Sequence, residues 1–467
     1  MSRFISFFCK EKSLVNRAFF VLIFTVAHSN CLIAADIVEG RIEIASSFNP
    51  VGSGARALGM GGAFISIADD ATAASWNPGA LIQIRNPELS IVGGYFNRTE
   101  SIDFGEIPEA AGDQEVNHPS LNYFSASYPC SKDICGRNMV FSVNYQNLYN
   151  FEKDWHFGFD GKGPGNSISS QSIDFEQTGD LYALGLAFAI EVYHGLSLGI
   201  TFNYWGDTLF KNEWEQNYNV RNKSTFSFNG TSVSSVSNSL RKEHFSFNGF
   251  NMNIGLLWEL YQKDEQKLTL GLVFKTPFTA DIKHNTEGID KFSNNGGVIQ
   301  TDITNISRNE EMELPMSFGI GLSYQFSDNF TLAGDVYRTS WDDFIRIDSN
   351  GNKLSAISNL PIKQSKVEAT YQVRLGGEYR IISQKFGENY IIPLRAGIFY
   401  DPAASEEGAD NFYGLSLGSG IAYERYVFDI AYQFRFAKKV GEYILPKQQF
   451  SEDVYEHTVY ASLSLRL

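Results

Sequence analysis

The chain has 467 residues, and its 53 Asp and Glu against 38 Lys and Arg exclude nucleic acid as an expected partner, because phosphates are bound through basic surfaces. Aromatic residues make up 14% of the chain and charged residues only 19%, with 41 Gly among the rest. This mixture favours strands joined by tight turns over helical bundles, and it fits a soluble β protein and a membrane barrel equally well.

The first residues follow the pattern of a secretory signal peptide. Four basic residues precede the apolar run at 18–27, and small residues follow at Ala34 and Ala35. A single N-terminal anchor helix is the alternative, but the apolar run is short for a bilayer. We therefore expect residues 1–35 to be a signal peptide that is cleaved after Ala35.

Residues 52–81 are the only part of the mature chain with few aromatics, many Gly and Ala, and no clean alternation. Their glycines let the backbone turn tightly and approach other backbone closely. Asp69 or Asp70 can cap a short helix over residues 71–76, and Pro78 ends it. A compact plug ahead of a run of strands is the simplest interpretation.

From residue 87 onward the chain alternates with a period of two, which predicts fourteen strands. In residues 181–190, for example, bulky apolar side chains occupy one face and small ones the other. The predicted strands are 88–98, 119–129, 137–149, 179–192, 195–209, 243–260, 266–281, 312–326, 329–344, 366–382, 390–401, 411–424, 426–438 and 454–467.

A bulky apolar face opposite a small or charged face is what a barrel wall in lipid needs, whereas a soluble sandwich turns its apolar face inward. Short and long links alternate strictly along the chain, and 210–242, one of the long links, reads as a β excursion. The sequence therefore predicts an all-β protein: a 14-stranded antiparallel transmembrane β-barrel at 87–467, with residues 36–86 inside its lumen as a hatch.

Several motifs carry a resemblance to a known family. The stretches 59–64 (Gly-Met-Gly-Gly-Ala-Phe), 67–71 (Ile-Ala-Asp-Asp-Ala) and 76–79 (Trp-Asn-Pro-Gly) resemble the N-terminal hatch of the FadL/TodX family. That family comprises bacterial outer-membrane transporters of long-chain fatty acids and aromatic hydrocarbons. Its hatch usually reads Asn-Pro-Ala, so Gly79 stands here in place of Ala. Further similarity to the family's strand pairs lies at 313–324, 330–344, 373–379 and 393–402.

The resemblance implies a protein of the bacterial outer membrane, in contact with outer-membrane lipid. It also implies passive uptake of hydrophobic small molecules, with no cofactor. The hatch would act as a ligand-controlled gate through Asn77, Pro78 and Gly79, together with Asp69 and Asp70. In the family the Asn-Pro-Ala segment packs at an inward kink of the third strand, which here would be 138–147.

Ligand-binding residues in the lumen are expected at Phe64, Arg374 and Arg380. Both arginines lie on the inferred inner face of one strand, where a carboxylate head group would find a cation. The alternative is that these arginines pair with Glu378 or Asp429 instead.

Cys130 and Cys135 are separated by four residues, which in an oxidising compartment predicts a disulfide closing a small loop. A metal site there would lack nearby His or Cys partners, so no metal is expected. The six histidines of the mature chain form no motif with a nucleophile or with paired ligands, so no catalytic residue and no enzymatic activity are expected.

Two other functions remain open from the sequence. The first is a barrel scaffold that transports nothing and is associated with protein secretion or surface attachment, because similar Gly-rich motifs occur in such barrels and the long links are polar. The second is a general porin with an open aqueous channel.

Overall fold

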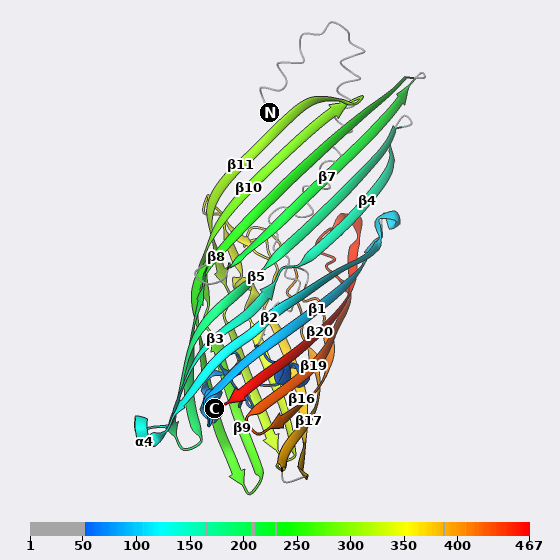
Figure 1. Ribbon diagram of the computed structural model, residues 1–467. Coiled ribbons are helices and arrows are strands. Elements are labelled where there is room, and N and C mark those ends of the chain that lie inside the picture. The colour runs from blue at the N-terminus through cyan, green and yellow to red at the C-terminus, as the bar shows by residue number, and fades with distance from the viewer. Residues whose placement is uncertain are drawn as a thin grey trace.

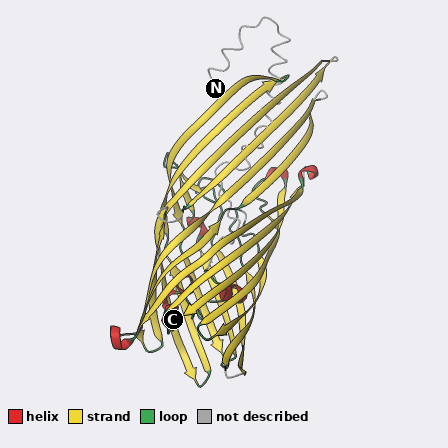
Figure 2. Ribbon diagram, in the orientation of Figure 1, coloured by secondary structure: helices red, strands yellow, loops and turns green. Residues whose placement is uncertain are grey.

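The computed structural model describes residues 52–105, 107–163, 167–206, 211–228, 231–385, 388–406 and 408–467. The expected signal peptide at 1–35 and the start of the expected hatch at 36–51 lie outside the described residues. Figures 1 and 2 show one tilted cylinder of strands with a few short helices. Among the described residues, no helix is long and apolar enough to span a bilayer.

Fourteen antiparallel strands close into a barrel, which confirms the predicted fold class. The ring closes where β1 (Glu88–Phe104) pairs with β20 (Phe450–Arg466) along their whole lengths. The strands between them are β2 (Gly112–Cys130), β3 (Met139–Asn150), β5 (Ser167–Tyr193), β6 (Leu196–Trp205), β8 (Thr231–Lys263), β9 (Gln266–Lys275), β12 (Ser317–Gln325), β13 (Phe330–Thr339), β16 (Thr370–Lys385), β17 (Glu388–Tyr400), β18 (Tyr413–Tyr423) and β19 (Tyr426–Val440).

The two faces of the wall differ as the alternation predicts. In β5, Leu186 is 61% exposed on the outside, while Ala183 and Ala189 are fully buried on the inside. In β16, Tyr379 is exposed and Glu378 is buried. Exposing so many apolar side chains to water around the whole cylinder would be unfavourable, so this outer surface is suited to contact with lipid.

Above one rim the same sheet continues beyond the closed barrel, and this part is here called the extension (Figure 1). It consists of β4 (Lys153–Gly163), β7 (Glu213–Phe228), β10 (Phe278–Asn294) and β11 (Gly297–Leu314), paired with one another and with the prolonged parts of β5 and β8. β5 has 27 residues and β8 has 33, so both run through barrel and extension. The β excursion predicted at 210–242 is therefore present, and the links at 150–178 and 282–311 are strands as well.

Two predicted strands are interrupted by proline. The strand predicted at 266–281 is β9 followed by β10, with Pro277 in the gap, and the strand predicted at 312–326 is β11 followed by β12, with Pro315 in the gap. Proline has no N–H to give to the sheet, so each strand leaves the wall at that point. Below the gaps, β9 pairs directly with β12.

The remaining links fold inward and fill the extension. Trp341 and Phe344 pack against Trp214, Phe245 and other apolar side chains of the extension, while Ile444 and Leu445 pack beside Trp155. The inner face of the extension is thus largely covered by the protein itself. The short elements in these links are η3 (Pro108–Ala110), η5 (Trp341–Asp343), β14 (Ile345–Ile347), β15 (Lys353–Ser355) and η6 (Pro446–Gln448).

Tight turns join the strands at the opposite rim. The turn between β2 and β3 carries the one-turn helix α4 (Lys132–Cys135), and a disulfide joins Cys130 to Cys135 with an S–S distance of 1.97 Å. Leu467 hydrogen-bonds the carbonyl of Pro87 at this same rim.

Candidate functional site: the N-terminal segment and the lumen above it

Residues 52–86, here called the N-terminal segment, lie inside the lower part of the barrel, drawn in dark blue in Figure 1. They form three short helices: α2 (Ala55–Gly59), α3 (Ala73–Trp76) and η2 (Pro78–Gln83). Asp70 accepts hydrogen bonds from the backbone and side chain of Thr72 just before α3. Pro78 opens η2, where the side chain of Asn77 accepts the N–H of Gly79 at 3.0 Å. Most of this segment is buried against the wall.

Glycines of the wall let the segment approach it closely. Gly199 of β6 pairs across the sheet with Gly255 of β8, and a Cβ on Gly199 would lie only 2.2 Å from the carbonyl carbon of Pro78. Gly376 of β16 pairs with Gly397 of β17, and a Cβ on Gly376 would lie 2.1 Å from the carbonyl oxygen of Met60. Any larger residue would therefore collide with backbone, so these glycines fix the place of the segment.

Glu378 of β16 is the main charged anchor of the segment. Its carboxylate accepts two hydrogen bonds from Arg56, at 3.0 and 3.2 Å, and one from Arg395 of β17 at 2.7 Å. Arg56 also pairs with Asp69 within the segment, and Arg395 pairs with Asp429 of β19 at 2.7 Å. One buried carboxylate thus joins the segment to the wall.

Hydrogen bonds to backbone groups complete the attachment. Asp335 of β13 accepts the backbone N–H groups of Phe64 and Ile65 at 2.6 and 2.9 Å. Asn77 donates to the carbonyl of Ile65 and to the carbonyl of Leu256 in β8, both at 2.9 Å. Asn77 therefore connects two parts of the segment to the wall with one side chain.

The residues expected to form the gate fall into two groups that lie in different parts of the segment. Asn77, Pro78 and Gly79 lie against β6 and β8, and the helix η2 that begins at Pro78 also lies near β3. Asp69 and Asp70 lie near Arg56, with Asp70 at 3.9 Å from its guanidinium. β3 pairs with β2 only as far as Gln146 and continues beyond it with β5 alone, so the two strands separate at mid-height of the wall.

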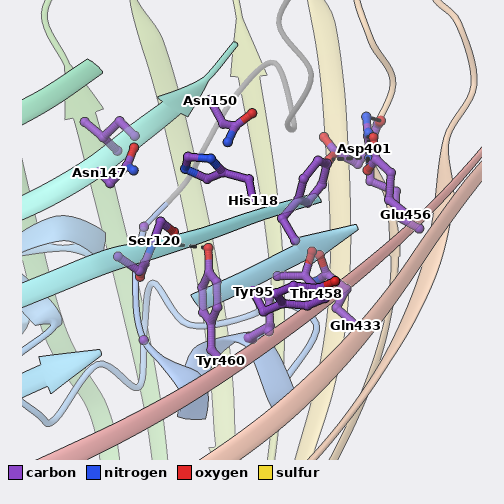
Figure 3. Close-up of a pocket in the computed structure, with 18 of the residues that line it drawn as sticks. Tyr95, His118, Ser120, Asn147, Asn150, Asp401, Gln433, Glu456, Thr458 and Tyr460 are labelled. Atoms are coloured by element: carbon purple, nitrogen blue, oxygen red, sulfur yellow. Dashed lines mark hydrogen bonds and ion pairs between the residues drawn. The ribbon is translucent and has the colours of Figure 1, made fainter. Parts of the chain in front are cut away.

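A pocket lies directly above the N-terminal segment, at the level where β2 and β3 separate (Figure 3). It is called the lumen pocket here, has a volume of about 140 Å³ and is partly open to solvent. Leu58, Gly62 and Trp76 of the segment line it from one side. Residues of the strands and of the loops that follow them line the other sides, among them Phe96, His118, Asn122, Asn150, Arg374, Asp401, Arg435, Glu456 and Tyr460.

Of the three residues expected to bind a ligand, only Arg374 lines this pocket. Arg374 donates to the carbonyl of Gly61 at 3.0 Å and lies 3.9 Å from Asp401. Phe64 is fully buried under Arg56 and packs edge-on against Trp76. Arg380 lies 3.7 Å from Glu378, so one arginine forms the pairing given as the alternative.

The family model for the outer membrane protein transport proteins (OMPP1/FadL/TodX) matches residues 45–440. This chain belongs to that family. It is therefore a protein of the bacterial outer membrane, within a family of transport proteins, as the motifs at 59–64 and 76–79 implied. A search of curated proteins found no match.

Solved structures of FadL/TodX proteins share the fold. A FadL homologue of Pseudomonas aeruginosa is 13% identical with a TM-score of 0.56, and the match covers 90% of this chain and 100% of that one. The toluene transporter TodX of P. putida is 13% identical with a TM-score of 0.53, covering 90% and 99%. The toluene transporter TbuX of Ralstonia pickettii is 13% identical with a TM-score of 0.50, covering 90% and 100%.

The charges around the lumen pocket of this FadL/TodX protein are paired with one another. Arg435 lies 2.8 Å from Glu456 and 3.2 Å from Asp401, and Arg98 of β1 lies 2.9 Å from Glu456. Asp401, Arg435 and Glu456 were not expected to be site residues from the sequence. The inward position of Arg435 follows from the alternation of its strand, but its partners come from other strands and loops.

A second buried charge cluster lies in the extension. His284 of β10 contacts Glu310 of β11 at 3.1 Å and Glu243 of β8 at 3.8 Å, and Arg346 binds Glu310 at 2.8 Å. Burial lowers the pKa of His284, but hydrogen bonds to Glu243 and Glu310 outweigh it and raise this pKa above its usual value. Burial likewise raises the pKa of Glu310, and the bonds from His284 and Arg346 outweigh it and lower this pKa to about 2.

These shifts predict a pH window for the extension. The raised pKa of His284 gives stability that is complete below about pH 6.5 and is lost as the pH rises through the folded-state pKa. The lowered pKa of Glu310 gives stability that is complete above about pH 4.5 and is lost as the pH falls towards 2. We expect amide exchange in β10 and β11, relative to β12 and β13 at the same pH, to be slowest between these limits.

The variant His284→Gln should remove the alkaline side of this dependence and speed exchange in β10 about tenfold, because Glu243 and Glu310 lose a charged donor. His156→Gln, a change at an exposed histidine of β4, is the control. Equal exchange in His284→Gln and the unmodified protein would contradict the prediction.

Proposed function

We propose that this protein takes up hydrophobic small molecules passively, such as long-chain fatty acids or aromatic hydrocarbons, and that its N-terminal hatch is the gate. One observation carries the proposal: the N-terminal segment fills the barrel directly beneath the lumen pocket. Two of the solved relatives are described as toluene transporters, which supports the same class of ligand.

The physical basis is the transfer of apolar surface out of water. Each buried CH₂ group gains about 0.8 kcal/mol, so a partly apolar lumen can extract such molecules where an open aqueous pore cannot. Passage then requires the N-terminal segment to move, since it packs tightly against the wall glycines. Asn77 is a suitable residue to replace, because its side chain bonds both Ile65 of the segment and Leu256 of the wall.

The test is uptake of radiolabelled toluene and oleate by cells that express the protein, with surface expression measured in parallel. The double variant Asn77→Ala and Pro78→Ala should change uptake at least threefold at normal expression. The control is Asn248→Ala, at an exposed position of β8 outside the lumen. Uptake by the double variant equal to that of the unmodified protein would mean that the segment is not the gate.

A scaffold that transports nothing is the second candidate, and one observation favours it. The inner face of the extension is covered by the protein's own loops, rather than left as an apolar groove for capture. Such a scaffold would show no saturable uptake of either compound. A general porin would instead give a large steady conductance in a planar bilayer, which a barrel filled by residues 52–86 should not give.

A further inference from the structure

We propose that the lumen pocket selects neutral aromatic molecules that carry a hydroxyl group, such as alkylphenols, over plain hydrocarbons and over carboxylates. This inference rests on the proposed function and names its substrate class. It comes from hydrogen-bonding groups in the pocket that the protein itself does not use.

The first of these groups is placed by a bulge in β2. The pairing of β1 with β2 shifts between Val92 and Gly93, so Asn122 is left opposite no partner in β1. Such a bulge turns two consecutive side chains to the same side, and both Asn122 and Tyr123 are buried, with Asn122 only 6% exposed. The side chain of Asn122 donates to the hydroxyl of Tyr460 at 3.1 Å. Its own oxygen has no hydrogen-bond partner among the described residues.

The second group is Asn150, at the end of β3 beyond the point where β3 has left β2. Asn150 is 9% exposed, and its side-chain oxygen accepts the N–H of Glu152 at 2.9 Å. Its amide nitrogen has no partner among the described residues. Figure 3 shows Asn150 beside His118, above Ser120 and Tyr460 in this view. The residues that line the pocket therefore carry one acceptor and one donor that are buried, neutral and without a partner among the described residues.

The charged groups of the pocket argue against an anionic ligand. Arg435 forms ion pairs with Asp401 and Glu456, and Arg374 lies near Asp401. His118 lies 3.2 Å from Asp180 and 3.5 Å from Glu152. A carboxylate would add an unbalanced charge beside these acidic groups, at the full cost of desolvation. A neutral hydroxyl both donates and accepts, so it can satisfy either unused amide group without that cost.

The apolar part of the ligand has matching surfaces. Phe96, Trp76 and Tyr460 line the same pocket, and aromatic side chains of this kind bind a ring by stacking or edge contact. A single ring with a hydroxyl and a short alkyl group combines both requirements. A hydrocarbon of the same size would leave the buried amide groups without partners.

The experiment is equilibrium dialysis of the full-length mature protein in detergent, against p-cresol, toluene and 4-methylbenzoate. Protein-free micelles provide the correction for partition. We expect p-cresol to bind about tenfold more tightly than toluene, as one or two neutral hydrogen bonds allow. Asn150→Leu and Asn122→Leu should each weaken p-cresol binding about three- to tenfold and leave toluene binding unchanged, whereas Asn248→Leu should change neither.

Equal binding of p-cresol and toluene by the unmodified protein would overturn the inference, and so would tighter binding of 4-methylbenzoate. These results need no variant, so they stand even where a substitution prevents folding. The uptake assay separates the two proposals: toluene uptake without a preference for p-cresol refutes only this inference. Absence of uptake together with absence of binding refutes both.

Discussion

Replacing Glu378 by glutamine is expected to lower the free energy of unfolding by about 3–5 kcal/mol, because Arg56 and Arg395 then lose the carboxylate that they share. The side chain of Glu378 is only 3% exposed and that of Arg395 only 4%. Water therefore cannot solvate the arginine charges that lose their carboxylate partner. Glutamine has nearly the same shape, and the effect therefore reports charge rather than packing. The measurement is denaturant unfolding of the purified protein in detergent.

The same variant should loosen the N-terminal segment, since Arg56 is its charged link to β16. We expect frequent conductance steps in a planar bilayer where the unmodified protein stays closed. The matched control is Glu259→Gln, which removes a half-exposed pair with Lys267 at the turn of β8 and should cost less than about 1 kcal/mol. Identical unfolding curves for Glu378→Gln and the control would show that the shared carboxylate does not hold the segment.

The second large effect is expected from Gly376→Val. A Cβ at this position would lie 2.1 Å from the carbonyl oxygen of Met60. Neither β16 nor the N-terminal segment can move away without losing its other contacts. We expect the folded barrel, seen as the heat-modifiable band on unboiled gels, to fall at least tenfold in yield.

The adjacent glycine offers a direct comparison. Gly377 faces the opposite side of β16, and the nearest atom to a Cβ there is 3.8 Å away. Gly377→Val should therefore give a yield close to that of the unmodified protein, since valine is favoured in strands. A loss of yield that is equal in both variants would mean that valine disturbs β16 itself and not its contact with Met60.

Much of the wall could be predicted from the sequence because lipid and lumen impose opposite demands on alternate residues. Leu186 and Ala183 follow this rule directly, and so do Tyr379 and Glu378. The positions of the turns could be predicted equally well, because each short link must reverse the chain at one rim. The breaks at Pro277 and Pro315 carried a visible signal, since each proline removes a donor from the sheet.

The site was less predictable because its contacts join residues far apart in the chain. The position of Arg374 on the inner face was foreseen, but its contact with Gly61 depends on how the N-terminal segment folds. The same holds for Asp335, whose two backbone partners are more than 250 residues away. Phe64 was expected to bind a ligand in the lumen, yet it is fully buried beneath Arg56 and does not line the pocket.

The bulge at Asn122 shows a further limit. Alternation assigns Asn122 and Tyr123 to opposite faces, and only the shifted pairing with β1 turns both inward. A single extra residue leaves no mark in the pattern of apolar and polar positions. The unused amide groups of the lumen pocket are therefore visible only in three dimensions.

The length of β8 has a consequence for where the protein meets a solute. At a rise of about 3.3 Å per residue and a tilt of about 45°, its 33 residues climb roughly 75 Å, whereas the apolar band of such barrels is about 25 Å tall. The far end of the extension therefore stands tens of ångströms clear of the lipid headgroups. For the proposed uptake we therefore expect the first encounter in the surrounding water, so that the dissolved concentration there sets how often a molecule arrives.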